Sequence, residues 1–295
     1  MNNRDRLQSI RKDKDFFVGI DSDGCVFDTM DLKQKEFFIP NGIKYFNLFA
    51  ISREVRETWE FVNLHSDTRG TNRFPALVRV FELLGRRKDI REKGFELPDI
   101  SSLEYWTEKE SKLGNESLNE YIKNNADPFL SQVLEWSLAV NHDIATWLRG
   151  VSPFNYVKEA LERISLVADS VVVSQTPAEA LEKEWEEHGL SKFVKLIAGQ
   201  EYGTKTEHIR YAATGRYAPE NILMIGDAPG DLKAAKDNKA CFFPVIPGKE
   251  AESWEILYKE ALDRFLTNTY KGEYEAGLLR SFEMALPDQP IWEQL

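Results

Sequence analysis

The sequence predicts an α/β fold, a doubly wound parallel sheet with an inserted, mainly α-helical domain. From about residue 151 onward, apolar runs of strand length alternate with amphipathic helical segments. Strands and helices in this order imply right-handed crossovers between parallel strands. One more strand-like run, at residues 16–21, is separated from that series by a block with helical patterning at residues 31–150.

The run at 16–21, FFVGID, is apolar up to its last residue and contains a glycine, a pattern typical of a strand buried on both faces. We expect the remaining strands within residues 170–175, 193–199, 221–227 and 240–245. The helices between them are expected at residues 153–168, 177–189, 204–215 and 229–238, with two further helical segments in 250–295.

The first strand must join the later sheet, because a single strand has no partner of its own. The chain therefore divides into a discontinuous core domain, residues 1–30 and 151–295, and an inserted helical domain, residues 31–150. Amphipathic stretches at 52–65, 73–87 and 127–150 predict helices throughout the insertion.

The composition narrows the class of function. The chain has 38 basic and 49 acidic residues, and its net charge of -11 argues against a broad surface for nucleic acid or anionic membranes. The net charge does not exclude a local site that binds a small anion. No run approaches the roughly 20 apolar residues that span a bilayer, and the N-terminal residues lack the apolar core of a secretory signal. We expect a cytoplasmic protein with reduced thiols, because only Cys25 and Cys241 are present.

Acidic residues follow two of the expected strands. Asp21 ends the first strand with Asp23 two residues later, and Asp227 ends another, with Asp231 in the first turn of the next helix. In a doubly wound sheet the ligand site forms beyond the carboxyl ends of the strands. Four carboxylates there repel one another unless a cation compensates them, and oxygen ligands alone favour Mg²⁺. The alternative is that these acids only cap helices and solvate loops.

Three other polar residues are expected near the same sheet edge. The strand SVVVSQT ends in Ser174 and Thr176, and Lys205 stands at a helix start after a glycine turn. A lysine there would supply the positive charge that a phosphoryl group needs. Lysines are common on protein surfaces, so the residue type alone does not indicate a function. The position of Lys205 relative to the acidic motifs is what suggests a functional role.

These segments resemble the four motifs of the haloacid dehalogenase superfamily. DSDGCVFDT resembles the first motif, Ser174 matches the second, Lys205 the third and GDAPGD at residues 226–231 the fourth, in the order expected. The helical block at 31–150 lies where that superfamily inserts a cap domain. Cys25 and Ser22 depart from the usual pattern; a thiol at Cys25 either tunes reactivity or simply packs as a small residue.

The resemblance implies a mechanism. Asp21 would attack phosphorus and form an aspartyl-phosphate, and Asp23 would protonate the leaving oxygen and then activate water. Ser174 would bind the phosphoryl group and Lys205 would pair with it. Mg²⁺ would be held by Asp21, the carbonyl of Asp23, and Asp227, with Asp231 as a direct ligand or a support.

The retained Asp23 favours cleavage of phosphate esters, because family branches that attack carbon or phosphonates lack an acid there. We expect a Mg²⁺-dependent phosphatase of a small phosphorylated metabolite. A phosphomutase or phosphotransferase acting on a sugar phosphate is the alternative, since it uses the same core. A non-catalytic binding protein is a third possibility, although no motif residue is missing.

Substrate specificity is expected to depend on the inserted domain. Within HSDTRGTNRF, residues 65–74, the side chains of Arg69, Thr71, Asn72 and Arg73 could grip an anionic or sugar-like group. The competing interpretation is a polar turn in which Asn72 caps a helix starting near Arg73.

Overall fold

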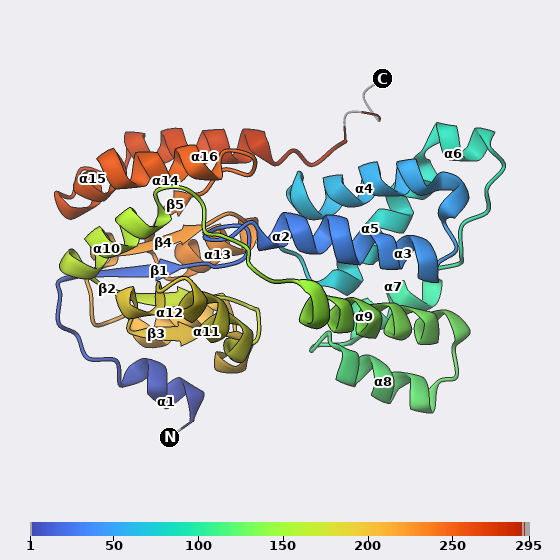
Figure 1. Cartoon of the computed structure of the whole chain (residues 1–295), viewed down its shortest axis with the longest axis horizontal. Helices are drawn as coiled ribbons and strands as arrows, with labels where there is room; N and C mark the ends of the chain where they lie inside the picture. The colour runs from blue at the N-terminus through green and yellow to red at the C-terminus, as the bar shows by residue number, and fades with distance from the viewer. Residues whose placement is uncertain (1, 291, 293–295) are drawn as a thin grey trace. The chain divides into compact units, whose positions relative to one another are not determined.

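The computed structural model describes residues 2–290 and residue 292 (Figure 1). The chain divides into two compact units. The α/β unit comprises the described residues up to Thr29 together with Val151–Ala285, and the helical unit comprises Met30–Gly150 with the described residues from Leu286 onward. None of the helices among the described residues is both long and apolar enough to cross a membrane.

The α/β unit contains five strands and the helices that cover them. The strands are β1 (Phe16–Ile20), β2 (Ala168–Val173), β3 (Leu196–Ala198), β4 (Ile222–Gly226) and β5 (Cys241–Pro244). The α-helices are α1 (Asn3–Gln8), α10 (Val157–Val167), α11 (Ala178–Glu187), α12 (Lys205–Ala212), α13 (Pro229–Asp237), α14 (Glu250–Ile256), α15 (Leu262–Leu266) and α16 (Glu273–Ala285). Short 3₁₀ turns at Ser191–Phe193, Gln200–Tyr202 and Pro219–Asn221 and a π-helix at Leu257–Ala261 complete the unit.

The sheet has the order β3-β2-β1-β4-β5, and every neighbouring pair is parallel. One face, which includes Val18 and Ile20, packs on a core shared with α10, α11, α14 and α15. On the other face a Cβ at Gly19 would lie 3.8 Å from Ile209 of α12, and α12 packs beside α13. Helices on both faces confirm the doubly wound α/β class that the alternating pattern predicted.

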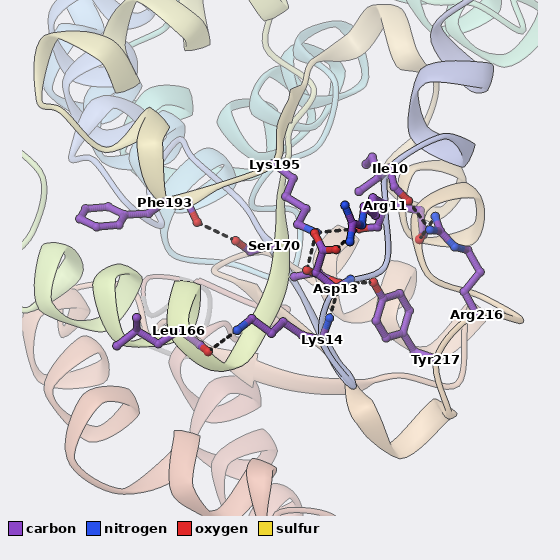
Figure 2. Close-up of polar contacts among 12 residues, drawn as sticks. Ile10, Arg11, Asp13, Lys14, Leu166, Ser170, Phe193, Lys195, Arg216 and Tyr217 are labelled. Carbon is purple, nitrogen blue, oxygen red and sulfur yellow. Dashed lines mark hydrogen bonds and ion pairs between the residues drawn. The ribbon is translucent and has the colours of Figure 1, made fainter.

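A polar network surrounds the buried Asp169, the second residue of β2. Figure 2 shows the residues around it, which include Asp13, Lys14, Lys195 and Tyr217. The backbone N–H groups of Asp13 and Lys14 donate to one oxygen of Asp169 at 2.9 and 3.1 Å, and the hydroxyl of Tyr217 donates to it at 2.7 Å. Lys195 pairs with the other oxygen at 2.6 Å. The network ties the chain before β1 to the sheet end opposite Asp21.

The helical unit is built from α-helices with two irregular turns. Its elements are α2 (Thr29–Leu32), which crosses the unit boundary, a π-helix at Lys33–Phe38, α3 (Ile39–Tyr45), a 3₁₀ turn at Phe49–Ile51, α4 (Ser52–Leu64), α5 (Arg73–Arg86), α6 (Lys88–Glu92), α7 (Ser101–Lys109), α8 (Asn115–Asn124) and α9 (Pro128–Trp147). Its core contains an aromatic cluster in which Trp136 packs 5.7 Å from Trp59 and 5.9 Å from Phe38 and Phe46, measured between ring centroids.

The described residues from Leu286 onward belong to the helical unit, whereas the sequence placed them with the core domain. The indole of Trp292 packs edge-on against Phe61 at 5.5 Å, and the Arg87 guanidinium lies 4.8 Å from its ring centroid. The backbone N–H of Asp67 donates to the carbonyl of Pro287 at 3.4 Å. Local sequence patterns carry no signal of such contacts, because the partners are far apart along the chain.

Candidate active site

The acids lie where the sheet topology changes direction. The chain leaves β1 toward β2 on one side and leaves β4 toward β5 on the other, so the segments that follow β1 and β4 diverge. Ligand sites in doubly wound sheets form at this switch point. Asp21 directly follows β1 and its backbone N–H donates to the carbonyl of Ile225 at 2.9 Å. Asp227 directly follows β4, so the parallel register brings the two acids to one edge.

Lys205 bridges two of these acids. Its ammonium lies 2.8 Å from Oδ2 of Asp21 and 2.7 Å from Oδ1 of Asp231. Lys205 is the first residue of α12, whose start is fixed by a capping box between Thr204 and Glu207. The preceding Gly203 has a φ of 109°, a backbone conformation that favours glycine. The capping box and the glycine turn at the N-terminus of α12 therefore place Lys205 beside the carboxylates.

Asp231 lies in the first turn of α13, as the sequence predicted, with Pro229 as the first helical residue. Its Oδ2 accepts the backbone N–H of Ala228 at 3.1 Å, which caps the helix. The side chain packs directly over Gly226, where a Cβ would lie 2.4 Å from the Asp231 Cβ. The GDAPGD segment thus needs glycine at its first position because the carboxylate folds back over it.

Burial sets the electrostatics of the site. Asp21 is 2% exposed, and Asp227 and Asp231 are fully buried. Burial, and then the charge of Asp231, raises the pKa of Asp21 to about 7, although Lys205 opposes the shift. Burial also raises the pKa of Asp231. Burial opposes the charge on Lys205 as well, but its two carboxylate partners outweigh that effect and raise its pKa.

The three buried carboxylates fit a divalent cation. Ligand oxygens of Asp21, Asp227 and Asp231 all lie within 4.8 Å of one another. When ionised they carry three negative charges against the one charge of Lys205, and the remaining repulsion is relieved by a bound cation. Because the donors are carboxylate oxygens only, a hard ion such as Mg²⁺ suits the set. The expected carbonyl ligand from Asp23 stays a prediction.

The carboxyl group of Asp23 lies outside this cluster and is held by two threonines. The hydroxyl of Thr29 donates to Oδ1 at 2.5 Å, and the hydroxyl of Thr176 donates to Oδ2 at 2.5 Å. The sequence marked Thr176 as a polar residue after a strand but gave it no role, and it did not single out Thr29. The signal available was the position of Thr176 at the carboxyl edge of the strand beside β1.

Ser174 directly follows β2 and is buried, with 2% exposure. Its backbone N–H donates to the carbonyl of Ala198 at 3.0 Å, which extends the sheet ladder by one step. Its hydroxyl accepts the backbone N–H of Thr176 at 3.2 Å. The expected contact between Ser174 and a phosphoryl group stays a prediction.

Cys25 and Ser22 have packing explanations. Cys25 is fully buried in the core of the α/β unit, and burial followed by the charge of Asp227 raises its pKa well above the usual value, so it stays a thiol. Its carbonyl accepts the indole N–H of Trp254 at 2.7 Å. The Ser22 hydroxyl accepts the indole N–H of Trp185 at 2.9 Å. The Ser22 side chain therefore serves a buried tryptophan, whereas the Cys25 thiol packs as a small core residue and only its backbone carbonyl contacts Trp254.

The side chains proposed for substrate binding make contacts within the helical unit. Asn72 is the N-cap of α5 and accepts the backbone N–H of Phe74 at 3.1 Å, as the competing interpretation expected. Arg73 donates to the hydroxyl of Ser137 at 2.9 Å. Arg69 is buried and donates to the carbonyl of Leu64 at 3.0 Å.

The fourth of these residues, Thr71, is exposed, and its backbone N–H donates to the carbonyl of Thr68 at 3.0 Å. Arg69, Asn72 and Arg73 thus have structural contacts of their own. Recognition of substrate by any of the four stays a prediction.

No protein-family model and no curated protein sequence matches the chain. Solved structures that match it include a haloacid dehalogenase-like family hydrolase from Streptococcus pneumoniae, 13% identical over 81% of this chain and 90% of that one, with a TM-score of 0.40. A HAD-superfamily hydrolase of subfamily IA from Geobacter sulfurreducens is 11% identical over 83% and 98% of the two chains, with a TM-score of 0.39.

A HAD-superfamily hydrolase from Ehrlichia chaffeensis is 14% identical over 78% of this chain and 87% of that one, with a TM-score of 0.36. These three structures carry the name of the superfamily that the four motifs resemble. At these identities and TM-scores, what the chain does has to be argued from the site itself.

Proposed function

We propose that the protein is a Mg²⁺-dependent phosphatase that cleaves a small phosphate monoester through an aspartyl-phosphate on Asp21. One observation supports this more than any other. A buried carboxylate, Asp21, is paired with a lysine at 2.8 Å and lies beside two more buried carboxylates, while a separately held acid, Asp23, follows two residues later. The proton donor, Asp23, is thus a separate group from the nucleophile, Asp21, which would share the cation site with Asp227 and Asp231.

In the first step a carboxylate oxygen of Asp21 forms a bond to phosphorus as the bond from phosphorus to the leaving oxygen breaks. Asp23 in its carboxylic acid form gives its proton to that oxygen, so an alcohol departs. In the second step Asp23 takes a proton from water as the water oxygen attacks phosphorus. The acyl phosphate breaks, and inorganic phosphate and the Asp21 carboxylate are released.

Lys205 would neutralise charge on the phosphoryl oxygens from its position between Asp21 and Asp231. The hydroxyl of Ser174 would contact the same phosphoryl group. When bound to Asp21, Asp227 and Asp231, Mg²⁺ would supply further charge neutralisation.

A phosphotransferase or phosphomutase is the second candidate, because the same groups serve when a sugar hydroxyl replaces water as acceptor. In that case Asp23 deprotonates the acceptor hydroxyl. Location in the cytoplasm, a small phosphorylated metabolite as partner, and the lack of nucleic-acid and membrane partners stay predictions.

The test measures phosphate release from p-nitrophenyl phosphate and then from a panel of phosphorylated metabolites, with Mg²⁺ and with a chelator. Asp21→Asn should abolish turnover, because the amide cannot attack phosphorus. Asp28→Asn removes an exposed acid from the same segment and should leave turnover unchanged. Label that accumulates on the protein or moves to a sugar would favour the transferase. Full activity of Asp21→Asn would refute both proposals.

A further inference from the structure

Each carboxylate oxygen of Asp23 accepts a hydrogen bond from a hydroxyl group, and the two donors come from different parts of the α/β unit. Thr29 lies six residues after Asp23 at the start of α2, and Thr176 lies in the segment between β2 and α11. Each hydroxyl oxygen lies 2.5 Å from the carboxylate oxygen that it contacts. The side chain of Asp23 is therefore fixed from two directions.

The backbone of Thr176 is itself held in place. Its N–H donates to the Ser174 hydroxyl at 3.2 Å, and its carbonyl accepts the N–H of Gln200 at 3.1 Å. The chain at Gly199 passes so close that a Cβ there would lie 2.5 Å from the Thr176 carbonyl oxygen. Nearby, Gln175 donates to the carbonyl of Gly203 at 3.0 Å. Thr176 is thus a rigid donor rather than a mobile surface hydroxyl.

We propose that Thr176 is a positioning residue that holds the Asp23 carboxyl group in the direction of the leaving-group oxygen. This inference rests on the proposed function. A free aspartate side chain rotates about two torsions, and restricting them favours the one orientation from which proton transfer is possible. General acid catalysis contributes about 10²- to 10⁴-fold, so a displaced Asp23 forfeits part of that factor.

Leaving groups that differ in their need for a proton separate this role from others. p-Nitrophenolate departs without protonation, whereas the phenolate of phenyl phosphate gains more from it. The two substrates share the phosphoryl group and have a similar ring, so contacts to the phosphoryl group affect both alike. The ratio kcat/KM reports steps only up to departure of the leaving group, so it excludes hydrolysis of the aspartyl-phosphate.

We expect Thr176→Val to lower kcat/KM for phenyl phosphate at least about tenfold more than kcat/KM for p-nitrophenyl phosphate. Thr176→Ser keeps the hydroxyl and should restore the wild-type ratio of the two substrates. Thr267→Val is the matched control, since the Thr267 hydroxyl donates to the carbonyl of Asp263 at the C-terminal end of α15. It should not change the ratio.

If thermal unfolding shows that Thr176→Val does not fold, a second variant tests the same proposal. Thr29→Val removes the donor to the other oxygen and should show the same preference for p-nitrophenyl phosphate. In an Asp23→Asn background, Thr176→Val should cause no further loss on phenyl phosphate, because the group that it positions is gone.

Equal losses on the two substrates, or no loss on either, would overturn the role of Thr176. Additive losses in the Asp23→Asn background would overturn it as well. Failure of the proposed function has a different signature: the wild-type protein would release no phosphate from p-nitrophenyl phosphate, or Asp21→Asn would remain active.

Discussion

Lys205 illustrates how a single residue holds the site together. It is 17% exposed and contacts two buried carboxylates, Asp21 and Asp231, which would otherwise repel each other. Because the pKa of Lys205 is raised, its ammonium stays charged at and well above neutral pH.

Replacing Lys205 by methionine should therefore damage both activity and stability. Loss of one group that stabilises developing charge costs about 10²- to 10³-fold in kcat. Removal of one partner from a buried ion pair costs about 3 kcal/mol of unfolding free energy. Urea unfolding and phosphate release would measure the two effects. Lys233→Met, which removes an exposed lysine paired with Asp237, is the control, and an equal effect there would contradict the prediction.

Gly226 shows that a residue without a side chain can determine the site. A methyl group added there would lie 2.4 Å from both Cβ and Cγ of Asp231, a distance at which something has to shift. Because Asp231 is fixed by Lys205 and by the N–H of Ala228, the shift would displace the carboxylate.

We expect Gly226→Ala to reduce phosphate release at least about tenfold and to destabilise the fold by roughly 2 kcal/mol through overpacking. Gly230→Ala is a suitable comparison, because a Cβ at Gly230 meets no heavy atom within 4 Å of the described structure. Equal phosphate release and equal unfolding free energy in the two variants would show that the close approach at Gly226 contributes to neither.

At the scale of elements, the packing of α3 on α4 depends on a helical glycine. The ring of Trp59 in α4 lies against Gly42 in α3, where a Cβ would come within 2.8 Å of the indole. In an exposed helix alanine is better than glycine by about 0.5 to 1 kcal/mol. The close ring reverses that preference.

Gly42→Ala should therefore lower the unfolding free energy, by roughly 1 to 3 kcal/mol if the ring is displaced. Gly85→Ala in α5 provides the matched control, since its nearest neighbour would be 3.9 Å away and the site is exposed. That variant should be neutral or stabilised by up to about 1 kcal/mol. Chemical denaturation would measure both, and stabilisation by Gly42→Ala would show that the ring moves without cost.

The segment before β1 is anchored to β2 by the network around Asp169 (Figure 2). Burial opposes ionisation of Asp169, but Lys195, Tyr217 and two backbone N–H groups outweigh it and lower its pKa. A carboxyl group with a lowered folded-state pKa stabilises the fold above its unfolded pKa, about 3.9, and loses that contribution as the pH falls.

Asp169→Asn should cost about 2 kcal/mol of unfolding free energy at neutral pH, because it removes a charged acceptor of several hydrogen bonds. The difference from the wild-type protein should stay constant down to about pH 5 and shrink below about pH 4. Unfolding curves measured across that range would test this. Parallel stability profiles for the two proteins would mean that Asp169 ionisation does not contribute.

At the scale of the whole molecule, a bound cation should stabilise the folded chain. An ion that binds only the folded state at 100 times its dissociation constant adds about 2.7 kcal/mol. Mg²⁺ should therefore raise the midpoint of thermal unfolding of the wild-type protein, and a chelator should reverse the shift.

Asp227→Asn should weaken or abolish this response to Mg²⁺. Without Mg²⁺ the variant should be at least as stable as the wild-type protein, because a buried carboxylate that repels Asp231 has been neutralised. Equal shifts with Mg²⁺ in both proteins would show that the ion binds elsewhere.

The sequence determined the positions of the strands to within a few residues and the order of the chemistry along the chain. Strand β1 was expected at 16–21 and lies at Phe16–Ile20, and Asp231 lies in the first turn of a helix that begins at Pro229. Buried parallel strands are continuous apolar runs, and helix starts follow local rules, so both are visible in short windows.

Only the tertiary structure decided which side chains meet. Thr176 lies 153 positions from Asp23 in the chain, and the contact between them depends on the register of β1 with β2. Likewise, the packing of Trp292 on Phe61 follows from how the helical unit closes. Short sequence patterns determine which polar side chains stand at each strand end. Hydrogen bonds between segments that are distant in the chain form only once packing has brought those segments together.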